Sequence, residues 1–131
     1  MRRDKTVILC VDDEENPLIL RKLVLEKAGY CVLTATSAVQ ALAVVASRRI
    51  DLVLSDYMMP GTSGAELARQ IKELWPRLPI ILHSGVNEIP ADAGCADLFL
   101  SKVEGPASLC ERIAAVLSGA RTRKRGTSGA L

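Results

Sequence analysis

Several features are missing from this sequence, and each absence excludes a class of protein. No apolar run approaches the roughly 20 residues that cross a bilayer, and the N-terminus MRRDKTVILCVDDE reaches acids before a signal-peptide hydrophobic region could form. The four cysteines include no CxxC pair, so their spacing indicates neither a zinc site nor a redox motif. His83 is the only histidine, which leaves no second imidazole for a metal site. We therefore expect a cytoplasmic protein with reduced cysteines and a packed or hydrogen-bonded His83.

Length and charge narrow the class further. The chain has 131 residues, 49% of them hydrophobic, which suits one domain with a core and leaves no room for a second. Four of the 17 Lys and Arg residues fall in the tail sequence RTRKR, which leaves 13 against 15 Asp and Glu, a body charge near −2. Basic contacts with nucleic acid would be confined to this tail, and four charges on a chain end do not favour nucleic acid as a partner.

Short apolar runs alternate with helix-period segments along the chain. The runs TVILCVDD, CVLTA, DLVLSD, PIILHS and DLFLSK are continuous in hydrophobicity, which is typical of strands buried on both faces of a parallel sheet. Five β–α alternations predict a doubly wound α/β sheet with helices on both faces. From Gly119 the sequence GARTRKRGTSGAL has no apolar periodicity, and we expect residues 119–131 to form a mobile basic tail after a domain spanning residues 5–118.

Helix starts and apolar stripes are recognisable between the strands. Asn16-Pro17 suits an N-cap and first turn, while Ser37-x-x-Gln40 and Ser63-x-x-Glu66 are capping-box patterns. The side chains expected in the core are Leu20, Leu23, Val24 and Ala28; Ala41, Leu42 and Val45; Leu67, Ala68, Ile71, Leu74 and Trp75; and Leu109, Ile113, Val116 and Leu117.

Acidic residues stand where two of the predicted strands end. Asp12 and Asp13 follow the first strand and Asp56 ends the third. With the strand order 2-1-3-4-5, one of the two common orders of doubly wound sheets, these strands are neighbours and their acids converge. Three close carboxylates repel one another unless a cation is bound, and magnesium prefers such oxygen ligands together with phosphate. The cluster therefore indicates phosphate chemistry.

Two further side chains should project toward the same edge. Ser84 ends the fourth strand and Lys102 the fifth, so Lys102 could pair with a phosphoryl oxygen while the Ser84 hydroxyl hydrogen-bonds another. A carboxylate such as Asp56 can act as the nucleophile and form an aspartyl-phosphate.

These pieces together resemble the receiver domain of two-component response regulators. The matching segments are VDDE, DYMMPGTSG, LHSG and FLSK, in this order along the chain. The resemblance implies a flavodoxin-like fold and a signalling switch, rather than an enzyme, in which Asp56 accepts phosphate from a sensor histidine kinase or phosphotransfer protein. The downstream protein target stays open.

The resemblance also assigns roles to individual residues. It implies a Mg²⁺ or Mn²⁺ site formed by Asp12, Asp13, Asp56 and the backbone carbonyl of Met58. Lys102 and Ser84 would contact the phosphoryl group, and Ser84 and Phe99 match the two switch positions.

One segment departs from the family pattern, and two other functions stay open. The connection GVNEIPADAGCADL after Ser84 is short and contains Pro90 and Gly94, so the helix between the fourth and fifth strands should be shortened or irregular. A degenerate receiver that only docks proteins is one alternative. A magnesium-dependent phosphohydrolase with an aspartyl nucleophile is the other, although its usual early DxD signature is absent.

Overall fold

Five parallel strands form one sheet in the order β2-β1-β3-β4-β5, as the sequence predicts. The computed structural model describes residues 5–85 and 94–129, with side chains as far as residue 120. The strands are β1 (Val7–Val11), β2 (Cys31–Ala35), β3 (Leu52–Asp56), β4 (Ile80–Ser84) and β5 (Leu98–Ser101). The helices within these residues are α1 (Glu15–Lys27), α2 (Ala38–Ser47), α3 (Gly64–Leu74) and α4 (Pro106–Gly129).

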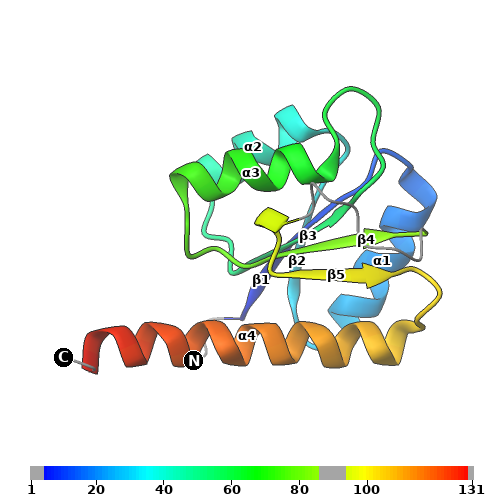
Figure 1. Cartoon of the computed structure of the whole chain (residues 1–131). Helices are drawn as coiled ribbons and strands as arrows, with labels where there is room; N and C mark the ends of the chain where they lie inside the picture. Colours follow the sequence, from blue (N-terminus) through cyan, green and yellow to red (C-terminus); the bar gives the residue numbers. More distant parts are fainter. Residues whose placement is uncertain (1–4, 86–93, 130–131) are drawn as a thin grey trace.

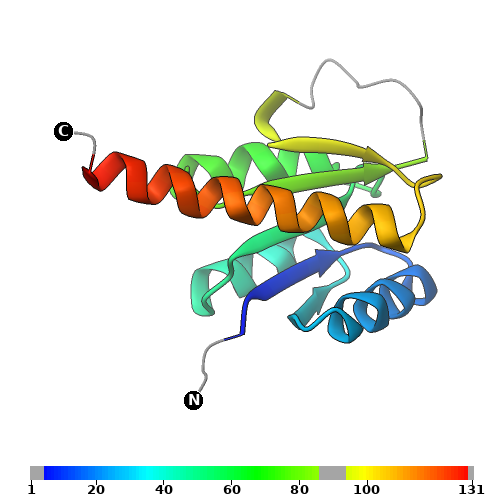
Figure 2. The ribbon, with the colours of Figure 1, turned by 90° about the horizontal axis from the view of Figure 1, so that it is seen from below.

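Helices cover both faces of the sheet, so the core has two halves. Figure 1 shows α2 and α3 above the sheet, and Figure 2, seen from below, shows α1 and α4 across its other face. Alternate strand residues divide between the halves: Leu9 packs with the α2 and α3 side, and Ile8 with the α1 and α4 side. Burial on both faces explains why the strands read as continuous apolar runs.

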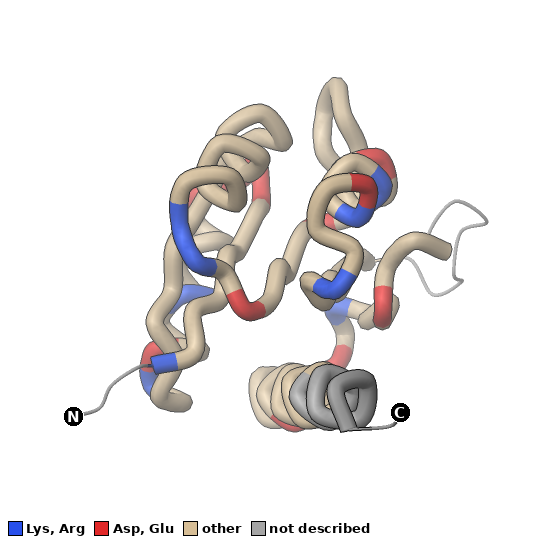
Figure 3. The backbone as a smooth tube through the Cα atoms, turned by 90° about the vertical axis from the view of Figure 1, so that its left-hand side faces the viewer, with Lys and Arg blue, Asp and Glu red and all other residues tan. Residues whose placement is uncertain are grey.

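Charged residues are almost absent from the strands. Asp56, the last residue of β3, is the one Lys, Arg, Asp or Glu within the five strands, and the other charged positions of the described chain lie on helices and connections (Figure 3). Moving a charge from water into a sheet that is buried on both faces costs free energy, so an acid in such a strand is tolerated at the end of the strand.

Acids also stand at the opposite, amino-terminal edge of the sheet, but there they have backbone and cationic partners. Asp51 Oδ2 accepts from the Val7 amide at 2.8 Å and lies 3.3 Å from Arg49 Nη1. Asp97 Oδ2 accepts from the Ile80 amide at 2.8 Å and lies 2.8 Å from Lys72 Nζ. These carboxylates therefore fix the first residues of β1 and β4 through their backbone amides.

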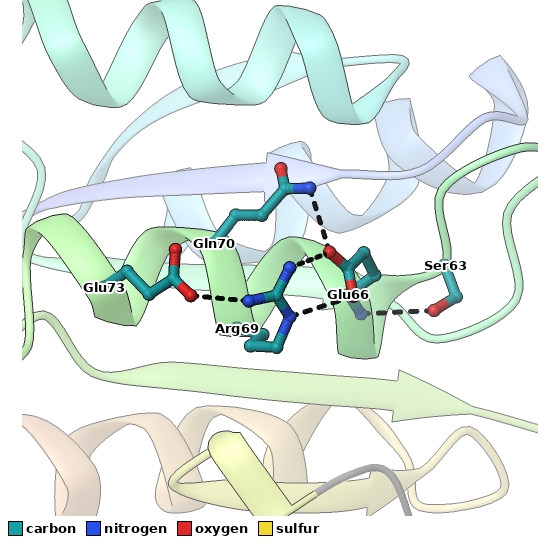
Figure 4. A network of polar contacts seen from close by, with 5 residues as sticks. All are labelled: Ser63, Glu66, Arg69, Gln70 and Glu73. Atoms are coloured by element: carbon teal, nitrogen blue, oxygen red, sulfur yellow. Dashed lines mark hydrogen bonds and ion pairs between the residues drawn. The ribbon is translucent and has the colours of Figure 1, made fainter.

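Two of the three predicted helix caps are confirmed. Ser37 Oγ accepts from the Gln40 amide at 3.1 Å, and Ser63 Oγ accepts from the Glu66 amide at 3.2 Å. The Glu66 side chain instead joins a surface network with Arg69 and Gln70 (Figure 4). This network runs on through Arg69 to Glu73, so it ties the first turn of α3 to its last.

The predicted start of α1 and part of two core stripes are wrong. Helix α1 begins at Glu15, with Glu14 as its N-cap, so Asn16 and Pro17 lie within its first turn. The amides of the first turn have no hydrogen-bond partner inside the helix, so a proline without an N–H loses no helical hydrogen bond there. Leu20, Leu23 and Ala28 are exposed, as is Leu74 at the end of α3. The buried residues of α1 are instead Leu18, Arg21 and Leu25, at a spacing of three and four. The run PLILRKLVL offers several apolar stripes, and docking against the sheet selects one.

The ends of the last predicted helices also differ from expectation. Residues 86–93, where the shortened or irregular helix was expected, lie outside the described residues, and Gly94–Cys95 form a short 3₁₀ segment before β5. Helix α4 continues to Gly129, past residue 118, where we expected an irregular tail to begin. Ala, Arg and Lys in residues 120–125 have high helix propensity and no proline follows Pro106, so the backbone continues the helix without an apolar stripe.

The state of the cysteines and the hydrophobicity of the described helices also bear on the expectations from the sequence. All four cysteines are free, and burial raises the pKa of the Cys10 thiol to about 12, which keeps it protonated and inert. None of the helices in residues 5–85 and 94–129 is both long and apolar enough to cross a bilayer.

Candidate functional site

Three carboxylates converge at the carboxyl edge of the sheet. Parallel pairing of β1 with β3 sets Val11 beside Ser55, so the next residues, Asp12 and Asp56, emerge side by side. One carboxylate oxygen from each of Asp12, Asp13 and Asp56 lies within 4.8 Å of the others. This convergence confirms the arrangement expected from the sequence. Oxygen ligands at this spacing form a group that could hold a hard divalent cation.

The three acids differ in their access to water. Asp12 is 1% exposed and Asp56 6% exposed, whereas Asp13 is exposed. Two carboxylates therefore form the floor of the site and the third stands at its mouth. An incoming ion can keep water on the Asp13 side, which matches the partial hydration that magnesium retains in proteins.

The two oxygens of Asp12 both have partners. Its Oδ1 accepts from the Glu14 amide at 3.0 Å, at the start of α1. Its Oδ2 lies 3.2 Å from Nη1 of Arg21, the seventh residue of the same helix. The Asp12 amide donates to the Ala35 carbonyl at 3.1 Å. These contacts hold the carboxylate in one orientation before any ligand is present.

Lys102, the residue after β5, completes the site. Its Nζ lies 2.7 Å from Asp56 Oδ1 and 3.9 Å from Asp12 Oδ2. Its backbone amide donates to the Ser84 carbonyl at 2.7 Å, which continues the β4–β5 ladder and fixes where the side chain starts. The structure thus brings Lys102 to the predicted acids and pairs it directly with Asp56.

The pKa of the Asp56 carboxyl is raised from its ordinary value. Burial is the main cause, and the nearby Asp12 charge adds to it. Lys102 acts in the opposite direction, because its ammonium group hydrogen-bonds the carboxylate and attracts its charge. Asp56 is therefore a desolvated carboxylate kept in reach of a cation, an environment that favours reaction of one oxygen with an electrophile.

The remaining predicted residues lie on β4, on β5 and just after β3. Ser84 is fully buried at the end of β4, beside Ser101 on β5. Phe99 is half-buried and its ring meets that of Tyr57 edge to face, with centroids 5.7 Å apart. The Met58 side chain is largely exposed just after Asp56.

His83 is packed in the interior. It is 7% exposed, and its Nδ1 has no hydrogen-bond partner among the described residues. Burial lowers the pKa of His83 to about 4, and the positive charges of Arg21 and Lys102 act in the same direction. A neutral, packed imidazole agrees with the expectation from the sequence.

Arg21 is the residue at this site that the sequence did not reveal. It occupies the inner stripe of α1, yet it alternates with Leu18 and Leu25, so its position in the chain is that of an ordinary core residue. An arginine within the apolar run of this helix, nine residues after a strand-end acid, is the signal that could have found it.

Comparison with known proteins identifies the family. A model of the response regulator receiver domain matches residues 8–114. The chain belongs to the response regulator receiver family. As a receiver, it is a signalling module of two-component systems rather than a classical enzyme.

The relatives agree in both sequence and structure. The chain is 42% identical over 116 residues to the phosphate regulon transcriptional regulatory protein PhoB of Pseudomonas aeruginosa, covering 84% of this receiver and 51% of PhoB. A CheY-like receiver domain from Methanospirillum hungatei superimposes with a TM-score of 0.85 at 28% identity, over 92% of this chain and 99% of that one.

A third relative was solved with ligands. The response regulator TrrA of Thermotoga maritima, in complex with Mg²⁺ and BeF, has a TM-score of 0.81 at 33% identity, over 85% of this receiver and 98% of that chain. The receiver spans about half the length of PhoB and of the Bacillus subtilis regulators that it also matches.

Proposed function

We propose that this receiver is a phosphorylation-dependent switch in which Asp56 accepts a phosphoryl group from a sensor histidine kinase or phosphotransfer protein. The observation that supports it best is the ion pair between Asp56 and Lys102, 2.7 Å long, beside two further carboxylates within 4.8 Å. A nucleophile, an acidic cation site and a positive charge for phosphoryl oxygens are the parts that phosphoryl transfer requires.

The residues fit a magnesium ion, with manganese as a substitute. Asp12, Asp13 and Asp56 would hold it together with the backbone carbonyl of Met58, an all-oxygen set. When bound, the ion supplies positive charge that offsets carboxylate repulsion and the charge developing on the phosphoryl oxygens.

In the transfer step, a carboxylate oxygen of Asp56 forms the new O–P bond. The P–N bond of a phosphohistidine, or the P–O bond of acetyl phosphate, breaks at the same time, and its electron pair leaves with the imidazole or acetate. Lys102 is close enough to exchange the Asp56 oxygen for a phosphoryl oxygen with a small side-chain movement. The Ser84 hydroxyl, buried at the end of β4, would donate to another.

The switch follows from contacts made in only one state. The Lys102 ion pair and the Ser84 hydrogen bond to phosphate would favour the phosphorylated conformation, since a ligand shifts an equilibrium by its differential affinity for the two states. Phe99 would move with Ser84, because its half-buried ring lies on the strand beside β4 and against Tyr57, the residue after Asp56. A downstream protein would then bind the altered surface.

The direct test is labelling with radioactive acetyl phosphate in the presence of Mg²⁺. The wild-type protein should become labelled, chelation of the metal should prevent it, and Asp56→Asn should abolish it. Asp51→Asn removes a carboxylate at the opposite edge of the sheet and should retain the label. Persistent labelling of Asp56→Asn would move the phosphorylated residue elsewhere.

Beryllofluoride separates the switch from a receiver that only docks proteins. A switch should bind beryllofluoride with Mg²⁺ and change the amide spectrum around Ser84 and Phe99. A docking module should keep the same spectrum with and without the ligand. Steady hydrolysis of a phosphate ester would instead indicate a phosphohydrolase.

A further inference from the structure

Arg21 places a permanent positive charge against the floor of the acidic cluster. The side chain is 8% exposed on the inner face of α1, and its Nη1 lies 3.2 Å from Asp12 Oδ2, on a residue that is itself 1% exposed. A buried arginine is stabilised only by a close partner, and this one has a carboxylate at the proposed metal site.

This contact alters the charge that a metal ion would meet. Asp12, Asp13 and Asp56 carry three negative charges, and two positive charges lie beside them, Arg21 against Asp12 and Lys102 against Asp56. Oδ1 of Asp12 accepts from the Glu14 amide and Oδ2 accepts from Arg21, so each oxygen already has one donor, and Oδ2 is the oxygen whose donor carries a charge. A divalent ion coordinated there has to share or displace the guanidinium.

The structure also leaves room for Arg21 to withdraw. A cavity of about 250 Å³ lies between the start of α1 and the start of α4, and Arg21 lines it together with Lys102, His83 and the apolar Leu109. A guanidinium leaving Asp12 can therefore turn into a neighbouring space without unfolding α1.

We propose that Arg21 is a positioning residue that holds Asp12 in the metal-free receiver and competes with the divalent cation for Asp12 Oδ2. The metal affinity is then lower than three carboxylates and one lysine would give, and Asp12 stays ordered when no metal is bound. This inference rests on the proposed function for the identity of the metal site, but it concerns only how strongly that site binds.

The test compares metal affinity in charge-changing and charge-preserving variants of the full chain. Mn²⁺ binding is followed by electron paramagnetic resonance of the free ion, and Mg²⁺ binding by calorimetry. Arg21→Met keeps a long side chain in the apolar stripe and should bind either ion about tenfold more tightly, the order expected when one partly screened unit charge beside the ion is removed. Arg21→Lys keeps the charge and should stay near the wild-type affinity.

Lys22→Met is the matched control. It removes the same charge one residue further along α1, where Lys22 pairs with Glu26 at 3.0 Å on the surface, and it should leave metal affinity unchanged. The metal-free Arg21→Met protein should also melt at a lower temperature than the metal-free wild type. Saturating Mg²⁺ should then raise its melting temperature by more than it raises that of the wild type. A purely structural arginine would lower the melting temperature without tightening metal binding.

A measurement on the wild-type protein covers the case in which Arg21→Met does not fold. The Nε–H nuclear magnetic resonance signal of Arg21, assigned by its loss in Arg21→Lys, should shift as Mg²⁺ saturates the site. An unmoved signal at saturation, or a folded Arg21→Met with unchanged or weaker affinity, would overturn the inference while phosphorylation of Asp56 remains intact. Absence of metal binding in both proteins would overturn it together with the proposed magnesium site.

Discussion

Lys102 reaches across β4 to contact Asp56. The two residues stand at the ends of β5 and β3, which are separated by β4 in the sheet, yet Lys102 Nζ lies 2.7 Å from Asp56 Oδ1. A long flexible side chain at the carboxyl edge can span a strand that a short one cannot. The contact makes Asp56 sensitive to the position of β5.

Replacement of Lys102 should therefore impair the reaction of Asp56. Lys102→Met is expected to slow phosphorylation by acetyl phosphate about 100-fold, because one positive donor aimed at developing negative charge is lost. The initial rate of labelling at saturating Mg²⁺ measures it. Lys72→Met, which removes a similarly half-buried lysine paired with Asp97, should react at the wild-type rate. Equal rates in the two variants would contradict the role of Lys102.

Removal of the exposed acid should weaken metal binding without harming the fold. Mg²⁺ is expected to raise the melting temperature of the wild-type protein, since a ligand that binds only the folded state stabilises it. Asp13→Asn should lose more than half of that rise, and its metal-free melting temperature should stay within a degree or two, because Asp13 is exposed. Differential scanning calorimetry with and without Mg²⁺ checks both.

The control for this variant is Glu15→Gln, an exposed acid in the first turn of α1. Its metal-dependent rise should match that of the wild type. If Asp13→Asn kept the full rise, the metal would be held elsewhere.

Acidification should destabilise the protein through His83. The folded pKa of about 4 lies below the ordinary histidine value of 6.5, so between these values the unfolded chain binds a proton that the folded chain does not. The stabilising contribution is complete above pH 6.5 and is lost as the pH falls toward 4, by roughly 2–3 kcal/mol. Asp56 opposes this trend, because a raised carboxyl pKa relieves a folding penalty on acidification.

Urea unfolding at pH 7 and pH 4.5 measures the loss. The Asp56→Asn substitution removes the opposing contribution. In that background, His83→Leu should reduce the difference in the free energy of unfolding between pH 7 and pH 4.5. If both proteins lost the same free energy of unfolding between pH 7 and pH 4.5, His83 would take up its proton equally in the folded and unfolded states.

Gly64 should not tolerate a side chain. A Cβ at this position would overlap the backbone oxygen of Asp56 and lie 3.0 Å from Cα of Tyr57, so Gly64→Ala has to push the end of β3 away. We expect a loss of about 2–4 kcal/mol, the range of overpacked cores and strained backbone, and a weaker metal-dependent rise in melting temperature. Gly119→Ala adds the same atom to α4 in open space and should be neutral or stabilising by up to about 1 kcal/mol. Similar stabilities for both variants would show that the loop before α3 adapts.

The strands and the acid cluster were predictable because their signals are local and repeated. Each strand is a short Val, Ile and Leu run, and parallel strands leave their carboxyl ends at one edge, so Asp12 and Asp56 could be brought together from the strand order alone. The caps at Ser37 and Ser63 depend on a hydroxyl and the amide three residues later, which the sequence also contains in full.

Arg21 and the inner face of α1 were not predictable in the same way. Leu18, Leu20 and Leu23 are equally hydrophobic, so the apolar pattern of this helix permits several orientations. The orientation adopted is the one in which Arg21 reaches Asp12, a contact with a different element that no helical periodicity encodes. The length of α4 was missed for a related reason: its last turns depend on helix propensity rather than on an apolar face.

The acids at the two edges of the sheet differ in how fully their charge is matched by cations. Asp51 and Asp97 each accept from one strand amide and pair with one side-chain cation. At the far edge three carboxylates converge, and Lys102 and Arg21 are paired with two of them. Of these two groups of acids, the one at the carboxyl edge keeps an unmatched negative charge, since three carboxylates face two cations. A small cation diffusing over the surface is drawn to that edge rather than to Asp51 or Asp97.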